Sequence, residues 1–500
     1  MKWRERTDRR SEIRMSSQKK SKNRQKTDLK SITRPYRIVS YISLALFASL
    51  IGYMVYFQVF LSDNLLNSPY NKRQEIVQEQ IVKGSLLDRS GNVLAETVTA
   101  EDGTESRNYP YGNLFAQAVG YSVYGGSGLE STENSTMLQS HADIVTQMQQ
   151  DIQEEKKQGD NVTTTLSAVL QQAASDALGS NRGAVFAMDA DTGEVLVDYS
   201  SPNFNPNTIE QDWESLVNSE DGVFLNRATQ GQYPPGSTFK IVTALAYYRQ
   251  HGTFDDFSYT CTGSYESDGY TIHCAGNEVH GQESFQDAMA NSCNCAFAYM
   301  AVNLIDKDLL RQTADQMGFN QDIPVELPYN GGEFTLDANT PNQLTMQTAI
   351  GQGDTLATPM LMCMVADAVK NNGQMMTPIF VKSVDSATGS NVKTVQPQIF
   401  GDVMTTEETQ ALEPLLEAVV QRGTAADDLS DLPYQIAGKT GTAEYGDVSE
   451  GKAHSWFTGY TNTGNNDIVV CAVVENGGNG RAPATRVARN VFSAWGTETY

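Results

Sequence analysis

Hydrophobic residues run without interruption through one segment near the N-terminus. Residues 38–61, IVSYISLALFASLIGYMVYFQVFL, are 24 residues without a formal charge. A helix of this length, at about 1.5 Å per residue, spans about 36 Å, which is more than the roughly 30 Å of a hydrocarbon core. The run is long for the apolar region of a signal peptide, and no small-residue cleavage pattern follows it. The pattern predicts a single, uncleaved transmembrane helix.

After this helix the chain divides into two parts with different patterns. Residues 62–157 are polar and broken, with weak strands at 78–82 and 92–97 and a helix at 142–157. This part cannot build a large core alone, so we expect a small mixed pedestal domain. Residues 158–500 form the second part, in which the apolar pattern is firmer.

The second part combines helical and strand patterns. The segment GAVFAMDADTGEVLVDYS predicts two strands joined by a turn at residues 191–193. After residue 434 the pattern predicts three strands and a helix that opens at Pro483, a residue suited to the first helical turn. Helices segregated from an antiparallel sheet indicate the α+β class. Further helices are predicted at 237–250, 284–305, 359–370 and 407–421.

Charge divides the chain at the membrane helix. Residues 1–37 hold fourteen Lys or Arg and four acidic residues, whereas the rest holds 22 basic and 56 acidic residues. Basic flanks stay on the cytoplasmic side, so we expect a cytoplasmic N-terminal tail and an extracellular remainder in the cell membrane. Beside a membrane span, the basic tail is expected to orient the helix and contact anionic lipid rather than nucleic acid.

A serine at the start of a predicted helix suggests chemistry. In YPPGSTFKIV, residues 233–242, Ser237 follows two prolines and a glycine, and Lys240 lies one helical turn further on. Serine in this place indicates an N-cap, but the amine could also take the proton of the hydroxyl. The Ser-x-x-Lys pattern recurs elsewhere in the chain. Only the copy at Ser237 stands where a rigid turn meets an apolar helix.

Two later segments supply further polar groups. Ser292 and Asn294 belong to NSCN, which ends a predicted helical turn, and Lys439 begins KTGT on a predicted strand. Taken singly, Ser292 is an ordinary helix cap, Asn294 an ordinary turn residue, and Lys439 an ordinary strand-edge lysine. Gly441, within KTGT, allows another backbone to approach closely.

The order Ser-x-x-Lys, Ser-x-Asn, Lys-Thr-Gly is typical of penicillin-binding proteins and class A β-lactamases. The chain resembles a class B, monofunctional penicillin-binding protein. The segments KGSLLDRSGNVLAET (83–97), AVGYSVYGGSGLE (118–130) and GQGDTLATPMLM (351–362) also resemble family signatures. One departure is Lys83, where the signature has arginine; this change keeps the charge and loses bidentate bonding.

The resemblance implies a serine-type peptidoglycan D,D-transpeptidase, with D,D-carboxypeptidase as a side activity, that β-lactams inhibit covalently. It implies a pedestal and a penicillin-binding, serine β-lactamase-like domain. Ser237 would be the nucleophile and Lys240 its base. Ser292 would relay a proton to the leaving amine, Asn294 would orient Lys240 and the substrate amide, and Lys439 would hold the substrate carboxylate.

The strand after Lys439 has implied roles as well. Thr440 would share the carboxylate, and the backbone N–H groups of Ser237 and Thr442 would form the oxyanion site beside Gly441. One such donor contributes about 2.7 to 4 kcal/mol in other hydrolases. The family also implies stem peptides as substrates and a SEDS-type glycosyltransferase, of the FtsW or RodA kind, as a membrane partner.

Two other functions remain open. ELPYN, residues 326–330, imitates the Glu-x-x-x-Asn pattern of class A β-lactamases, in which Glu326 would activate water for hydrolysis. A non-catalytic β-lactam receptor or scaffold is the second alternative. The three intact motifs count against a non-catalytic protein, and the membrane anchor and pedestal, which serve no obvious purpose in a β-lactamase, count against the hydrolase.

Cysteine and histidine positions carry less information. Cys261 and Cys274 bracket a polar loop, and a disulfide there would contribute about 3 kcal/mol, although spacing alone leaves free thiols as the alternative. The remaining cysteines, including Cys293, are expected to be small apolar fillers. The five histidines show no metal-ligand spacing, and the chain has no nucleotide loop or cofactor signature. The sequence thus predicts neither a metal nor a cofactor.

Overall fold

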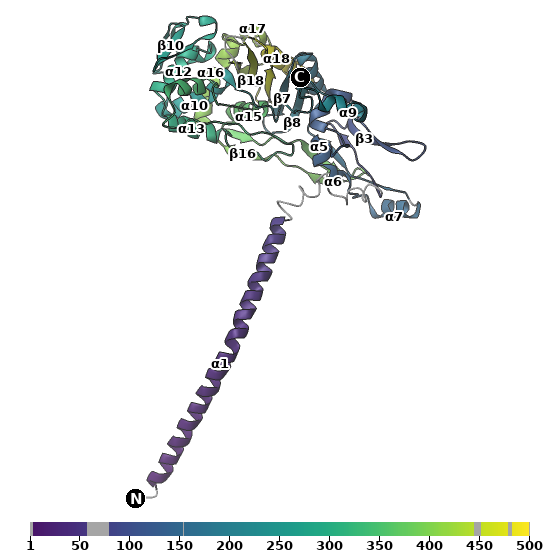
Figure 1. Ribbon diagram of the computed structural model, residues 1–500, viewed down its shortest axis with the longest axis vertical. Helices are drawn as coiled ribbons and strands as arrows, with labels where there is room; N and C mark the ends of the chain where they lie inside the picture. The colour runs from purple at the N-terminus through teal and green to yellow at the C-terminus, as the bar shows by residue number, and fades with distance from the viewer. Residues whose placement is uncertain (1–3, 58–79, 154, 445–451, 479–482, 500) are drawn as a thin grey trace. The chain divides into compact units, whose positions relative to one another are not determined.

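The computed structural model describes residues 4–57, 80–153, 155–444, 452–478 and 483–499. The chain divides into two units, Met1–Asn71 and Lys72–Tyr500. In the first unit, α1 (Arg4–Tyr56) is one long helix (Figure 1). Its segment Tyr36–Tyr56 has 21 residues, a mean hydropathy of 2.0, and thus the length and composition of a membrane span. The predicted apolar helix is confirmed, although residues 58–61 of the prediction lie outside the described residues.

The pedestal of the second unit is built on a sheet that is shared with a distant part of the chain. Its six strands lie in the order β15-β14-β6-β2-β3-β4, and β2 pairs parallel with β6. The strands β14 (Val381–Asp385) and β15 (Asn391–Thr394) therefore complete the sheet begun by the pedestal residues. The domain boundary between residues 157 and 158 stays a prediction. The elements before the predicted boundary are β1 (Ile81–Val82), β2 (Leu86–Leu87), β3 (Val93–Thr99), β4 (Glu105–Asn108), η2 (Gly112–Phe115), α4 (Ala116–Val119), α5 (Gly128–Thr132), α6 (Asn134–Met137) and α7 (Ile144–Gln153). The strand β5 (Lys157–Gln158) spans this boundary, and β6 (Asn161–Thr164) follows it.

A buried ion cluster joins two signature segments of the pedestal. The Lys83 ammonium lies 2.6 Å from one carboxylate oxygen of Glu130, and Arg107 Nε lies 2.7 Å from the other. The Glu130 side chain is fully buried. Lys83 also donates to the backbone oxygen of Glu130 at 3.2 Å. Lysine thus fits the place where the family signature has arginine, and Arg107 supplies the second cation.

The sheet with the longer strands, called here the large sheet, has five antiparallel strands in the order β17-β18-β19-β7-β8. Helices α8 and α18 pack on each other and on the sheet, and α15 packs on β7, β18 and β19. Figure 1 shows α15 and α18 beside β18. All residues of β18 and β19 are buried, so helices cover both faces of these strands. The α+β prediction is confirmed. The bounds are β17 (Ile436–Glu444), β18 (Ala453–Thr461), β19 (Ile468–Val474), β7 (Gly183–Asp189), β8 (Val195–Ser201), α8 (Ala168–Leu178), α15 (Pro359–Lys370) and α18 (Pro483–Thr499).

The predicted helix at 284–305 is wrong as a single element. It is two helices, α11 (Phe285–Ala290) and α12 (Asn294–Asn303), separated by a turn. Ser292 in this turn has a φ of +54°, a left-handed conformation that cannot continue a right-handed helix. The turn carries the Ser-x-Asn motif.

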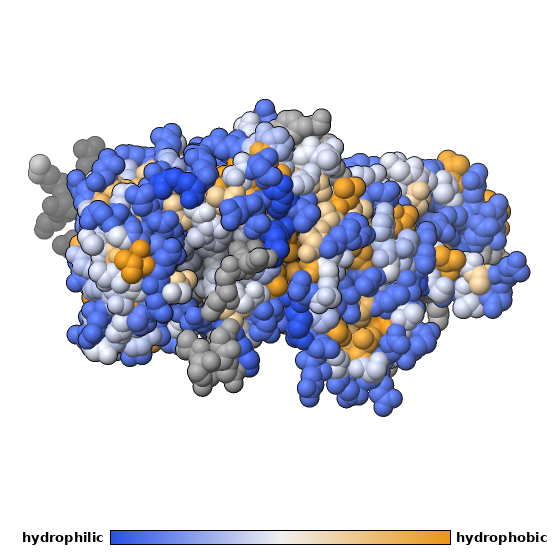
Figure 2. Space-filling model, turned by 90° about the horizontal axis from the view of Figure 1, so that it is seen from above, coloured by the Kyte–Doolittle hydropathy of each residue, from blue (hydrophilic) through white to orange (hydrophobic). Residues whose placement is uncertain are grey.

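The remaining elements lie outside these two sheets and include α10, whose first eight residues are buried. Figure 2 shows a mostly hydrophilic face with smaller groups of hydrophobic side chains. The predicted helices at 237–250 and 407–421 correspond to α10 and α16. These elements are η3 (Pro206–Thr208), α9 (Ile209–Val217), η4 (Gly236–Phe239), α10 (Lys240–His251), β9 (Ser258–Cys261), β10 (Ser264–Ser267), β11 (Tyr270–His273), η5 (Ala275–Asn277), β12 (Gly281–Ser284), α13 (Lys307–Gln316), α14 (Asn342–Ala349), β13 (Gln374–Met376), β16 (Ile399–Asp402), α16 (Thr406–Gln421) and α17 (Ala426–Leu429).

Candidate active site

Ser237 lies in the 3-10 turn η4, which leads directly into α10. The N-cap of η4 is Pro235 and that of α10 is Phe239, so the capping interpretation of Ser237 is wrong. Gly236 has a φ of +55°, and a Cβ added there would lie 2.7 Å from the backbone oxygen of Thr442. The turn therefore packs directly on β17, and the half-buried Ser237 lies next to the segment that contains Thr442.

Lys240 connects the first motif to the second. Its side chain is fully buried. Its ammonium group donates to the Ser292 backbone oxygen at 2.7 Å and to Asn294 Oδ1 at 2.8 Å, and it lies 3.3 Å from Ser292 Oγ. The ammonium also lies 5.2 Å from the centre of the Phe297 ring. The α11–α12 turn thus surrounds the lysine with acceptors.

Lys439 connects the third motif to the same serine. It lies on β17, the edge strand of the large sheet, yet it is fully buried, so the interpretation as a surface lysine is wrong. Its ammonium group donates to Ser292 Oγ and to the Thr440 backbone oxygen, both at 2.9 Å. The Ser292 hydroxyl therefore lies between two lysines.

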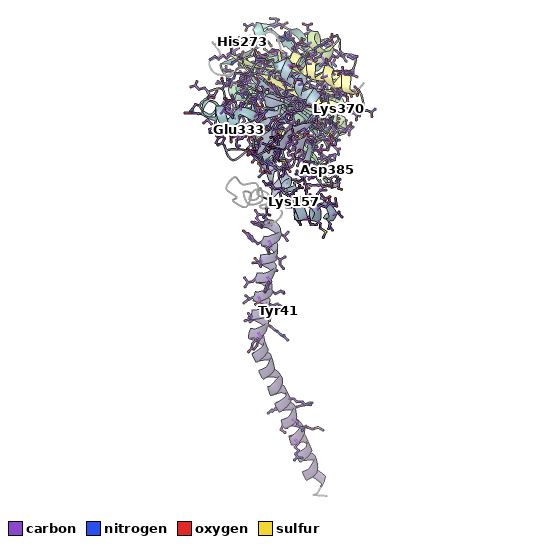
Figure 3. The ribbon with its side chains drawn as sticks, turned by 90° about the vertical axis from the view of Figure 1, so that its right-hand side faces the viewer. Tyr41, Lys157, His273, Glu333, Lys370 and Asp385 are labelled. Carbon is purple, nitrogen blue, oxygen red and sulfur yellow. The ribbon has the colours of Figure 1, made fainter. Side chains whose placement is uncertain are left out.

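Asn294 is held from both ends of its amide. Its oxygen accepts from Lys240, and its nitrogen donates at 3.0 Å to the backbone oxygen of His273, a residue at the surface in Figure 3. The cap of α12 is Cys293, whose sulfur accepts from the Ala296 N–H. Ser292 is thus not a helix cap, and Asn294 is more than a turn residue.

Burial changes the acidity of both lysines. Burial lowers the pKa of Lys240 to about 8, and burial together with the charge of Lys240 lowers the pKa of Lys439 well below its usual value. Among the described residues, no carboxylate lies within 4 Å of either ammonium. A neutral amine is therefore accessible near physiological pH.

The rest of KTGT is tightly packed beside the turn. A Cβ on Gly441 would lie 2.9 Å from the Trp456 Cβ and 3.1 Å from the Pro235 backbone oxygen, so only glycine fits without movement. The Thr440 hydroxyl forms a short hydrogen bond with that of Thr424. No motif spacing indicated Thr424, which the sequence analysis missed.

Two other sequence-based hypotheses do not match the structure. Glu326 accepts from the Phe380 N–H at 3.3 Å, next to β14 of the shared pedestal sheet, and burial raises its pKa. Among the described residues, Glu326 has no contact with Ser237, Lys240 or Lys439 that would support a hydrolytic role. The disulfide between Cys261 and Cys274 is not formed: both thiols are free, and their sulfurs lie 3.6 Å apart. The Cys274 sulfur also contacts those of Cys293 and Cys295.

Comparison with known families gives two matches. Residues 183–493 match the penicillin binding protein transpeptidase domain. Residues 83–162 match the penicillin binding protein A dimerisation domain. The first match contains the Ser237, Ser292 and Lys439 motifs, and the second contains Lys83, Arg107 and Glu130.

Individual relatives agree with these families. The peptidoglycan D,D-transpeptidase PbpA of Mycolicibacterium smegmatis is 29% identical over 87% of this chain and 94% of the relative. The peptidoglycan D,D-transpeptidase MrdA of Acinetobacter baumannii is 28% identical over 78% of this chain, and the match spans 66% of that relative's length. Penicillin-binding protein A from M. tuberculosis, solved as its penicillin G acyl-enzyme, superposes with a TM-score of 0.75 at 25% identity, covering 83% of this chain and 99% of that one.

Proposed function

The chain belongs to the penicillin-binding protein transpeptidase family, and we propose that it is a serine D,D-transpeptidase that cross-links peptidoglycan stem peptides. The relatives named above are peptidoglycan D,D-transpeptidases, and β-lactams acylate a structural neighbour. The observation that carries the proposal is the Ser292 hydroxyl, which accepts hydrogen bonds from both Lys240 and Lys439. A single hydroxyl thereby joins motifs that are far apart in the sequence.

This geometry supports the following acylation step. The neutral Lys240 amine removes the Ser237 proton while Ser237 Oγ attacks the carbonyl carbon of the penultimate D-alanine. The tetrahedral oxyanion lies between the backbone N–H groups of Ser237 and Thr442, and the contact of Gly236 with the Thr442 backbone supports this placement. Collapse breaks the peptide bond and leaves an acyl-serine.

Proton delivery and substrate binding use the other groups. The Ser292 hydroxyl passes a proton from the lysines to the departing D-alanine amine, and Asn294 holds Lys240 in place. Lys439 and Thr440 bind the terminal carboxylate of the stem peptide, whose charge favours the ammonium form of Lys439. An amine of a neighbouring strand then attacks the acyl-serine, and the reverse proton transfers release Ser237. Water in place of that amine gives the carboxypeptidase side reaction.

Labelling with a fluorescent penicillin tests the nucleophile. We expect the full-length protein to form one covalent adduct that peptide mapping assigns to Ser237, and the Ser237→Ala variant to remain unlabelled. Ser390→Ala is the matched control, because Ser390 begins an exposed Ser-x-x-Lys copy and should not affect labelling. Labelling of the Ser237→Ala protein would refute the assignment.

We further infer that α1 places the catalytic domain outside the cell. The basic residues 1–37 precede the uncharged part of the apolar segment, residues 38–56, which favours a cytoplasmic N-terminus. Protease added to intact spheroplasts should degrade the penicillin-binding domain and spare a tag on the N-terminus. If the domain is protected and the tag is degraded, the orientation is the opposite of the one proposed.

A SEDS-type glycosyltransferase is the partner that we propose for α1 and the pedestal. Helix α7 supports this, because Ile144, Val145, Met148 and Ile152 are 61% to 81% exposed along it. We expect a polymerase of this kind to co-purify from membranes and Ile144→Ser with Ile152→Ser to weaken the association. Equal recovery with the variant would exclude α7, and absence of any polymerase would refute the partnership.

A further inference from the structure

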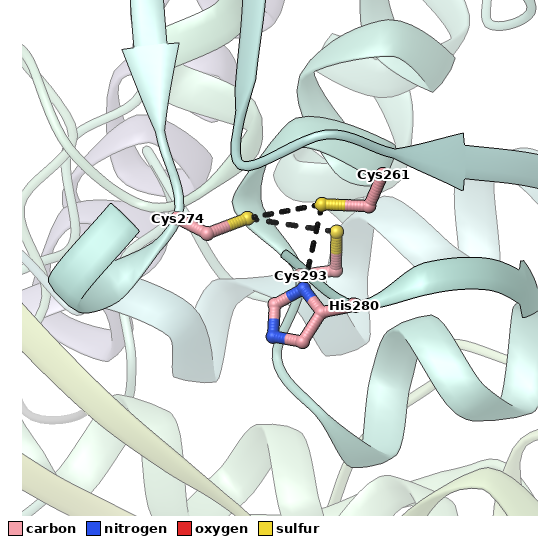
Figure 4. Close-up of side chains that lie close together, drawn as sticks. All are labelled: Cys261, Cys274, His280 and Cys293. Atoms are coloured by element: carbon pink, nitrogen blue, oxygen red, sulfur yellow. Dashed lines mark hydrogen bonds between the residues drawn. The ribbon is translucent and has the colours of Figure 1, made fainter. Parts of the chain in front are cut away.

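Three cysteine sulfurs and one histidine nitrogen lie close together beside the Ser292–Asn294 turn. Figure 4 shows Cys261, Cys274, His280 and Cys293 grouped around one centre, and their ligand atoms lie within 4.8 Å of one another. They come from the end of β9, the residue after β11, the loop before β12 and the cap of α12. The three cysteines are buried, and the His280 side chain is 8% exposed.

The distances match those of a tetrahedral metal site. Cys261 Sγ lies 3.6 Å from Cys274 Sγ and 3.5 Å from His280 Nδ1, and Cys274 Sγ lies 3.7 Å from Cys293 Sγ. With zinc bonds of about 2.3 Å to sulfur and about 2.0 Å to nitrogen, tetrahedral ligands lie about 3.5 to 3.8 Å apart. We propose that Cys261, Cys274, His280 and Cys293 bind one structural zinc ion. Three thiolates and one imidazole form a closed ligand set of the Cys3His type.

The surroundings of the ligands support this assignment. The Gly263 N–H donates to Cys261 Sγ and the Ala296 N–H to Cys293 Sγ, each at 3.4 Å, and such donors stabilise thiolates. His280 Nε2 lies 3.8 Å from a carboxylate oxygen of Glu278. This contact leaves Nδ1 for the metal, as carboxylates commonly do for ligating histidines. The intervals between ligands are too long for a familiar zinc pattern, which explains why the sequence predicted no metal.

The site would hold the second catalytic motif in place. Cys293 stands between Ser292 and Asn294, and the backbone oxygen that receives the Asn294 amide belongs to His273, next to Cys274. One ion bound to Cys274 and Cys293 would therefore fix the backbone on both sides of the hydrogen bond between Asn294 and His273. It would also fix the turn at Ser292. Small displacements of such groups lower rates by about a hundredfold. We expect loss of the ion to reduce penicillin acylation about ten- to a hundredfold.

Metal analysis tests the site directly, independently of the proposed transpeptidase function. Full-length protein, purified from membranes through a tag without histidine and in buffers without chelator, should contain about one zinc per chain by plasma mass spectrometry. Cys274→Ser and Cys293→Ser should lose nearly all of it. Cys363→Ala and Cys471→Ala are matched controls, because both cysteines are fully buried outside the cluster, and they should keep the metal. Cys295→Ser should keep it as well, although its sulfur lies 3.3 Å from Cys274.

Two outcomes would overturn the zinc site. One is wild-type protein that contains no zinc, or a disulfide among these cysteines by mass spectrometry. The other is equal metal loss in the cluster and control variants. If the cluster variants do not fold, wild-type protein exchanged with Co²⁺ should show the visible bands and the thiolate charge-transfer band of a tetrahedral cobalt site, and their absence would equally refute the proposal. If acylation is unchanged after a chelator removes the zinc, the zinc site itself stands, but its proposed role in holding Asn294 is refuted.

Discussion

Two clusters of buried basic groups in this protein are built in opposite ways. In the pedestal, Lys83 and Arg107 both contact the buried carboxylate of Glu130, at 2.6 and 2.7 Å. In the penicillin-binding domain, Lys240 and Lys439 are fully buried, and their described partners are hydroxyl, amide and carbonyl groups. The pedestal cations thus share a carboxylate, whereas no described carboxylate lies within 4 Å of the two lysines of the second cluster.

The acidity of the groups reflects the same contrast. Burial would raise the pKa of Glu130, but the charges of Lys83 and Arg107 outweigh it and keep that carboxyl ionised. Burial lowers the pKa of Lys83, and Glu130 opposes this effect. Burial also lowers the pKa of Lys240, to about 8, against the smaller opposing effects of Cys293, Cys274, Cys295 and Glu283. The pedestal cluster is therefore expected to determine stability and the second cluster to determine reactivity.

The largest effect is expected from Lys240→Met. This variant removes the base and leaves the buried space filled, so the acylation rate constant for fluorescent penicillin should fall about a thousandfold. The thermal unfolding temperature of this variant should not fall, because the substitution removes a buried cation that has no described counter-charge and therefore removes its desolvation cost. A rate within tenfold of the wild type would show that another group removes the proton.

Glu130→Gln should show the reverse pattern. It leaves Lys83 and Arg107 buried without a carboxylate, which should lower the free energy of unfolding by about 3 to 5 kcal/mol. The acylation rate per folded molecule should stay within about twofold. Chemical denaturation gives the free energy of unfolding. Active-site titration gives the fraction of folded molecules, by which the acylation rate is divided. Loss of acylation without loss of stability would contradict the structural role of the pedestal cluster.

Gly441→Ala is expected to have a smaller effect on both quantities. The new Cβ would press on Trp456 and on the Pro235 backbone, shifting η4 away from β17, so acylation should fall about tenfold. Gly401→Ala is the matched control on a strand, because its Cβ would meet only Val403 Cγ1 at 3.4 Å. Similar rates for both variants would show that the contact between η4 and β17 does not matter for acylation.

The sequence was sufficient for the fold class and the function because short motifs carry both. The predictions of family, fold class and D,D-transpeptidase activity are confirmed by the matched families and relatives. The chemical roles of Ser237, Lys240, Ser292, Asn294 and Lys439 remain predictions, although hydrogen bonds join the last four residues and Ser237 lies in the turn before Lys240. Motif spelling could indicate them because the reaction needs those groups in any member of the family.

Contacts between distant segments were beyond the reach of sequence patterns. The break before α12 depends on the left-handed backbone of Ser292, which an apolar helical pattern hides. The partner of Thr440, Thr424, lies on a segment without a motif. The sheet shared by the pedestal with β14 and β15 likewise depends on a chain return that no local pattern encodes.

The pH dependence of acylation tests most directly whether the neutral amine of Lys240 is the base. The pKa of Lys240 is lowered to about 8 and the neutral amine is the active form, so the rate constant for penicillin should rise about tenfold per pH unit below 8 and level off above it. Glu130→Gln should keep this inflection, and Lys240→Met should lose it. A flat profile from pH 6 to 10 in folded wild-type protein, or the same inflection in Lys240→Met, would contradict the account.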